Sequence, residues 1–181
     1  ATSAVRGLSR TNLWRLGAIA VVGGSIPFIL FFEGLGQAAP ANAAIIQKSL
    51  FLWVGLLAVP MLGERLGWAQ VGALAALVLA QLLIGRPAGI ELGRGELMVL
   101  AATLLWSAEI IIARKALATV PAQVAATARM ALGAIILLAY IVITGRAGDL
   151  VQFSAEQVGW LAITALLLFA YVSLWYGALK R

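Results

Sequence analysis

The chain has 181 residues, of which 63% are hydrophobic and only 11% are charged. Because a soluble domain is typically about half apolar and a quarter charged, this composition excludes water as the main solvent and indicates a lipid bilayer. With no Cys and no His, the chain offers no disulfide, thiolate nucleophile or imidazole ligand, and we expect no metal site and no cofactor. The net charge of +6 does not indicate nucleic acid, because the basic residues lie at the ends of apolar runs and form no basic stripe.

Six apolar runs are each long enough to cross about 30 Å of hydrocarbon, which takes about 20 helical residues. In chain order they cover residues 14–35, 40–61, 67–85, 96–114, 121–144 and 157–178. Gly, Pro and charged residues lie between the runs, and no connection is long enough to separate two soluble domains. The sequence therefore predicts an all-α membrane protein, a polytopic helical bundle with six transmembrane helices in this chain.

The distribution of Lys and Arg between the two ends of the runs predicts their orientation. The side that holds the N-terminus carries eight basic residues: Arg6, Arg10, Arg15, Arg65, Arg114, Lys115, Lys180 and Arg181. The opposite side carries three: Arg86, Arg94 and Arg146. Because positive charge is retained in the cytoplasm, we expect the N-terminal side to be cytoplasmic and the first of these helices to run outward.

Two helix ends, FILFFEGLGQ at 28–37 and VSLWYGALKR at 172–181, are 144 residues apart and similar in sequence. Each has an aromatic pair, a Gly within the next two residues and a Leu at the same offset, Leu35 and Leu179. The first end closes without a charge, whereas the second closes on Lys180 and Arg181, which places the two ends on opposite sides of the membrane. An inverted-topology repeat has this property.

Several short motifs follow one another along the chain. They are Ala41-Asn42-Ala43-Ala44, Leu62-Gly63-Glu64-Arg65-Leu66, Leu105-Trp106, Ala113-Arg114-Lys115, Arg129 and Tyr176-Gly177-Ala178-Leu179-Lys180-Arg181. No motif is diagnostic by itself, but their order and spacing resemble the EamA-type transporters of the drug/metabolite transporter superfamily. The resemblance covers most of the chain.

This resemblance implies a ten-helix fold of two inverted five-helix repeats, of which the chain would supply about the third to the eighth helix. Residues 1–90 would then be the C-terminal part of the first repeat, and residues 91–181 the N-terminal part of the second. The chain begins without Met, so we expect it to start inside a longer sequence. The resemblance also implies a bacterial cytoplasmic (inner) membrane as the location, and it leaves a homodimer open.

Leaving aside the first two and last two residues of each run, four ionisable residues lie within the apolar runs: Glu33, Lys48, Glu109 and Arg129. A charge near the bilayer centre costs roughly 3 kcal/mol or more unless it is paired or hydrated, so each is a candidate for the substrate or proton pathway. We expect Glu109 and Arg129 to pair, because they lie at similar depths on consecutive antiparallel runs; a structural clamp or a snorkelling Arg is the alternative. Glu33 and Lys48 lie near the outer ends of adjacent runs, where they could pair or reach water separately.

Three uncharged residues are further candidates for the substrate pathway. Trp53 and Trp106 lie nearer the middle of their runs than the other Trp residues, so they either pack between helices or line a cavity. Asn42 could hydrogen-bond a polar ligand, but such side chains also join transmembrane helices to each other.

These features predict a secondary transporter that exports small metabolites such as amino acids by alternating access, the substrate class being implied by the resemblance alone. One alternative is an importer or exchanger of sugar-phosphate or nucleotide-sugar compounds, although only Lys48 and Arg129 could supply basic side chains inside the membrane. Another is a membrane assembly subunit without transport activity. We expect no enzyme, because the Ser and carboxylate side chains are too scattered for a catalytic cluster. The expected partners are a small-molecule substrate and the lipid bilayer.

Overall fold

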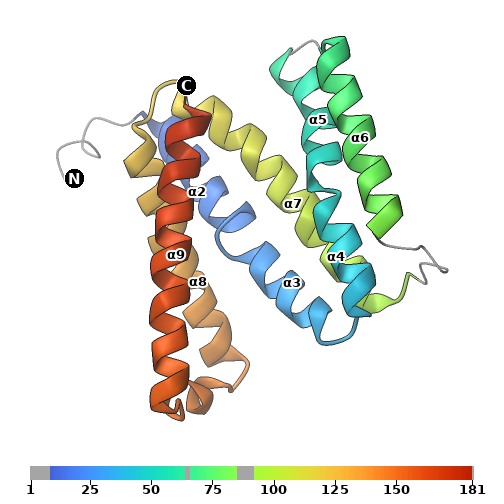
Figure 1. Ribbon diagram of the computed structural model, residues 1–181. Coiled ribbons are helices and arrows are strands. Elements are labelled where there is room, and N and C mark those ends of the chain that lie inside the picture. The colour runs from blue at the N-terminus through green and yellow to red at the C-terminus, as the bar shows by residue number, and fades with distance from the viewer. Residues whose placement is uncertain (1–8, 64–65, 85–91, 181) are drawn as a thin grey trace. The chain divides into compact units, whose positions relative to one another are not determined.

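The computed structural model of the protein describes residues 9–63, 66–84 and 92–180 (Figure 1). Its elements are α2 (Arg10–Val22), α3 (Ile26–Leu35), α4 (Pro40–Lys48), α5 (Leu50–Leu62), α6 (Trp68–Ile84), α7 (Arg94–Leu117), α8 (Ala122–Ile143), the 3-10 helix η1 (Ala147–Val151) and α9 (Ala155–Leu179). Among the described residues, five stretches are long and apolar enough to cross a membrane: Arg10–Leu35, Pro40–Leu62, Arg94–Leu117, Ala122–Ile143 and Ala155–Leu179. The 17 residues of α6 correspond to the remaining predicted run. The polytopic helical fold predicted from the sequence is thus confirmed.

Two of the predicted continuous helices are interrupted, which corrects the sequence prediction. The run over 14–35 forms α2 and α3, separated by Gly23-Gly24-Ser25, and the run over 40–61 forms α4 and α5, separated by Ser49. Periodicity and hydropathy do not distinguish these cases, because an interrupted helix crosses the membrane with the same apolar residues as a continuous one. Both interruptions fall in the interior of apolar stretches.

The interruption between α2 and α3 keeps its backbone groups hydrogen-bonded, as the hydrocarbon environment requires. The backbone N–H groups of Gly23 and Gly24 donate to the Ile19 carbonyl at 2.8 and 3.2 Å. The Gly24 N–H also donates to the Ala20 carbonyl at 3.0 Å, and the Ser25 hydroxyl donates to the Ala20 and Val21 carbonyls at 3.1 and 3.2 Å. The last turn of α2 therefore ends without exposing those carbonyls to lipid.

The described residues form two compact units, each with its own core. The terminal unit contains α2, the end of α7 from Ile112 onward, α8 and α9; in it α2 packs on α8 and α8 packs on α9 (Figure 1). Its core consists of Leu16, Ile19, Ala113, Ala116, Leu117, Val120, Ala125, Ala126, Val172 and Tyr176. The many Ala residues allow the helix backbones to approach closely, which is how transmembrane helices associate in lipid.

The middle unit contains α3, α4, α5, α6 and α7 up to Ile111. Its core consists of Ala43, Ile46 and Val99, packed against Phe31, Ala38 and Leu100. Glycine allows the closest contact between α3 and α7, since a Cβ at Gly34 would lie 2.9 Å from the Gly95 carbonyl oxygen. Helices α5 and α6 lie side by side, with Leu74 against Gly55 (Figure 1).

Candidate functional site

Arg129 lies beside the interruption between α2 and α3. It occupies α8, is only 8% exposed, and its Nη2 donates a hydrogen bond to the Gly23 carbonyl oxygen at 2.9 Å. Gly23 is the C-cap of α2, where the carbonyl ends of the helix carry a partial negative charge. The guanidinium is therefore fixed in orientation by a half-helix that ends within the membrane-spanning stretch.

The position of Arg129 depends on a very close approach between α8 and the same interruption. A Cβ at Gly133, one turn along α8, would lie 2.5 Å from the Gly24 carbonyl oxygen and 2.9 Å from the Gly24 Cα. Since these are backbone atoms, no side chain can be added at this crossing without separating the two segments. The absence of side chains at Gly24 and Gly133 lets the Arg129 guanidinium reach the end of α2.

A second basic residue ends the other interrupted helix. Lys48 is the last residue of α4 and is exposed, and Ser49 follows it as the C-cap. The Ser49 hydroxyl donates to the Ile46 carbonyl at 2.6 Å and accepts from the indole N–H of Trp53 at 2.9 Å. A cation at the C-terminal end of a half-helix is electrostatically favourable, so each of the two described interruptions combines a helix C-terminus with one basic side chain.

Glu109 lies on the part of α7 that belongs to the middle unit and is only 4% exposed. The same helix carries the buried hydroxyls of Thr103 and Ser107, each of which donates to the carbonyl of the residue four positions earlier at 2.8 Å. These back-bonded hydroxyls keep an oxygen that can accept a hydrogen bond. The pairing of Glu109 with Arg129 stays a prediction, as does a pairing of Glu33, which is half-buried on α3, with Lys48.

The two central Trp residues have different surroundings. The ring of Trp106 packs on Phe28 and Phe31, with centroid distances of 5.4 Å to each, so it belongs to an aromatic cluster between α3 and α7. Trp53, by contrast, is anchored on Ser49 and lines a half-open apolar pocket of about 200 Å³. The pocket is lined by Leu52, Trp53, Gly55, Leu56, Leu66 and Leu74. Packing is the role that the surroundings of Trp106 support.

Asn42 contributes to a hydrogen-bonded clamp whose second member, Glu96, could not be recognised from the sequence. Its Nδ2 donates to Oε1 of Glu96 at 3.4 Å, and the backbone N–H of Ala39 donates to the same oxygen at 3.0 Å. The clamp holds a buried carboxylate at the N-terminus of α4, where the helix dipole favours a negative charge. Glu96 is the first residue of the predicted run 96–114, where a charge is ordinary, and the Ala39 amide that it binds lies 57 residues earlier in the chain.

Some residues used in the sequence analysis lie outside the described residues: Arg6, Glu64, Arg65, Arg86 and Arg181. The orientation derived from the charge distribution therefore stays a prediction.

Comparison with known proteins agrees with this helical architecture. The model of the EamA-like transporter family matches the chain over residues 3–86 and again over residues 93–181. No curated protein and no solved structure matches it. Because the two matches include nearly the whole sequence, the chain belongs to the EamA-like transporter family and is a membrane transporter of the drug/metabolite transporter superfamily.

Proposed function

We propose that the protein is a secondary transporter that exports small metabolites bearing a carboxylate, such as amino acids, across a bacterial cytoplasmic membrane by alternating access. The observation that carries the proposal is the interruption of two membrane-spanning helices, each with a basic residue at the end of a half-helix. Discontinuous helices are where secondary transporters hold substrates and coupling ions, because half-helix ends supply charge and backbone groups near the midplane.

Arg129 is the residue that we propose for substrate recognition. A guanidinium binds a carboxylate through two parallel hydrogen bonds, and such binding is strong only where the guanidinium is held in one orientation and removed from water. The bond from Arg129 to Gly23 and its 8% exposure provide both conditions. In the same proposal, Glu109 is the proton-coupling residue, because its carboxylate is buried in an apolar helix and would bind and release a proton during transport.

The experiment that tests this proposal is counterflow transport by the full-length protein in proteoliposomes, with a panel of amino acids and their uncharged amides. We expect saturable transport of at least one amino acid, at least 100-fold slower transport of its amide, and loss of transport in Arg129→Gln. Arg146→Gln, which removes an exposed charge, serves as the control and is expected to transport normally. Equal transport of acid and amide, or wild-type transport by Arg129→Gln, would contradict a carboxylate site at Arg129.

The same proposal includes the orientation of the helices, which single-cysteine labelling can test because the chain has no Cys. Gly148, in η1, is exposed and has no heavy atom within 4 Å of an added Cβ, so Gly148→Cys is expected to fold normally. We expect this cysteine to react with an impermeant maleimide added outside intact cells. A cysteine at Ser9, on the predicted cytoplasmic side, should react only after the cells are opened; the reverse pattern means that the orientation is wrong.

A further inference from the structure

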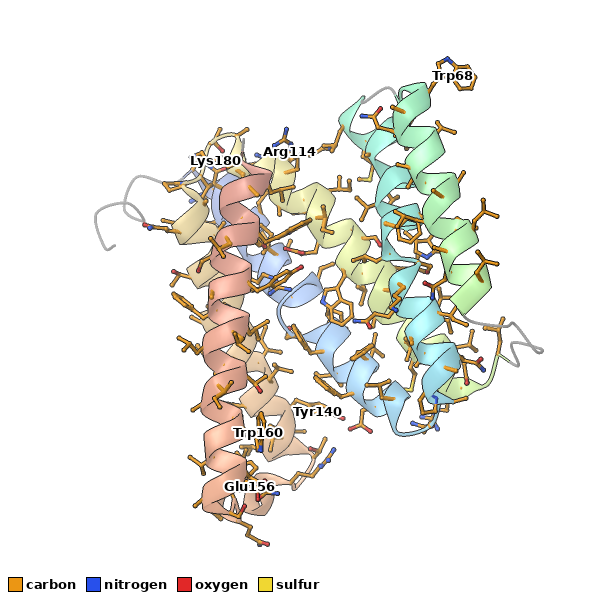
Figure 2. All side chains as sticks on the ribbon, in the orientation of Figure 1. Trp68, Arg114, Tyr140, Glu156, Trp160 and Lys180 are labelled. Carbon is orange, nitrogen blue, oxygen red and sulfur yellow. The ribbon has the colours of Figure 1, made fainter. Side chains whose placement is uncertain are left out.

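One end of the terminal unit gathers basic side chains from three helices. They are Arg10 and Arg15 in α2, Arg114 and Lys115 in the last turn of α7, and Lys180 at the end of α9. Figure 2 shows Arg114 and Lys180 at the same end of this unit. We call these five residues the basic end. Two of them adjoin core residues in the sequence: Arg15 precedes Leu16, and Arg114 follows Ala113.

Hydrogen bonds between elements hold the basic end together. Nη1 of Arg15 donates to the Lys115 carbonyl at 3.4 Å, and Nη1 of Arg114 donates to the Leu179 carbonyl. Each bond joins two helix ends and uses one N–H group of a guanidinium that has five. The two arginines are thus positioned by the protein and retain donors that can bind an anion.

The charge of the basic end is not balanced within its own unit. The sequence of the terminal unit contains two acidic residues, Asp149 and Glu156. Both belong to the opposite end, in η1 and in the first turn of α9. Figure 2 shows Glu156 at the far end of α9 from Lys180, and the 25 residues of that helix span about 37 Å.

The surroundings of the basic end indicate what kind of anion it meets. Trp14, next to Arg15, is 82% exposed, and an exposed indole at the end of a membrane-spanning helix lies among lipid headgroups. The basic side chains beside it must lie at the same level, where phosphate groups of anionic lipids are concentrated. The exposed indole of Trp14 therefore favours a lipid phosphate over a dissolved anion, because binding of a dissolved anion does not require a side chain at the headgroup level.

We propose that the basic end binds the phosphate of an anionic phospholipid, such as phosphatidylglycerol, and that this lipid bridges the ends of α2, α7 and α9. The guanidinium groups of Arg15 and Arg114 provide directed hydrogen bonds to the phosphate. Lys115 and Lys180, both exposed, add attraction that depends on charge alone. This lipid site is separate from the proposed substrate site at Arg129, so either can fail without the other.

The test is native mass spectrometry of the full-length protein with phosphatidylglycerol or phosphatidylcholine at matched concentrations. Wild-type protein should bind phosphatidylglycerol in preference to phosphatidylcholine. The variant Lys115→Gln/Lys180→Gln should bind it about 30-fold more weakly, because each basic residue at an anionic surface contributes roughly a factor of five. The matched control is Arg94→Gln/Arg146→Gln, which removes the same charge from exposed residues at the start of α7 and just before η1, and it should keep wild-type affinity.

Two results would overturn the proposal: equal binding of the two lipids by wild-type protein, or equal weakening by both double variants. Inorganic phosphate is added as a competitor, and displacement of the lipid by millimolar phosphate would mean that the site takes a dissolved anion instead. If the double variant does not fold, the comparison of the two lipids on wild-type protein still decides the question.

Discussion

Gly133→Ala is expected to destabilise the full-length protein by about 3 kcal/mol, although Ala is the better helix former by about 1 kcal/mol. The added Cβ would lie 2.5 Å from the Gly24 carbonyl oxygen, inside the contact distance of any two such atoms. Relief requires α2 and α8 to separate, which opens the core around Ile19 and Ala126. The measurement is the midpoint of thermal unfolding in detergent, followed by size-exclusion chromatography of heated samples.

The matched control for this effect is Gly17→Ala on α2, where an added Cβ has no heavy atom within 4 Å. This variant is expected to be as stable as wild type or slightly more stable, by up to about 1 kcal/mol, since only helix propensity changes. A Gly133→Ala protein that unfolds at the wild-type temperature would show that the two backbones do not approach as described.

Glu109→Gln and Arg129→Gln are each expected to destabilise the protein by about 3 to 5 kcal/mol, while the double variant loses much less than the sum. Both residues are buried, at 4% and 8% exposure, so if they pair as predicted, removing one charge leaves the other without its partner. Arg129→Gln also loses the bond to the Gly23 carbonyl, so it is expected to be the more damaging of the two single changes. Thermal unfolding of all four proteins in detergent completes the cycle, and strictly additive losses would rule out the pair.

A control cycle uses the exposed residues Arg146 and Glu156, whose neutralisation is expected to be nearly additive and small. Transport then separates the two roles of the predicted pair. If Glu109 is the proton-coupling group, Glu109→Gln should remove the pH dependence of transport while the protein still folds. Unchanged pH dependence would instead assign the pair to a structural clamp.

The positions of the membrane-spanning stretches could be predicted from the sequence because apolar length is a local property. Most predicted ends differ by one to three residues, and the largest difference is four, at Arg10 against residue 14. The interruptions could not be predicted, because the contact that fixes one of them is not local. Gly23 ends α2 beside an arginine 106 residues later in the chain, and no window of the sequence contains both.

Some residues of the candidate site could be recognised from the sequence and others could not. Arg129 and Glu109 stand out as charges in apolar runs, and both are buried as a constrained intramembrane charge should be. The role of Trp106 depended on which rings surround it, and Phe28 and Phe31 come from a helix far away in sequence. Glu96 was missed because a carboxylate at the start of a helix is common, whereas its bond to the Ala39 amide is a feature of the folded chain.

The clamp at Glu96 has a mechanical consequence for the middle unit. The start of α4 is fastened to the start of α7 by the two bonds that this carboxylate accepts, and a Cβ at Gly95 would lie only 2.5 Å from the Ala38 amide nitrogen. We therefore expect the starts of α4 and α7 to move together. A change in the direction of α5 relative to α4 would then occur at Ser49, the residue between the two helices.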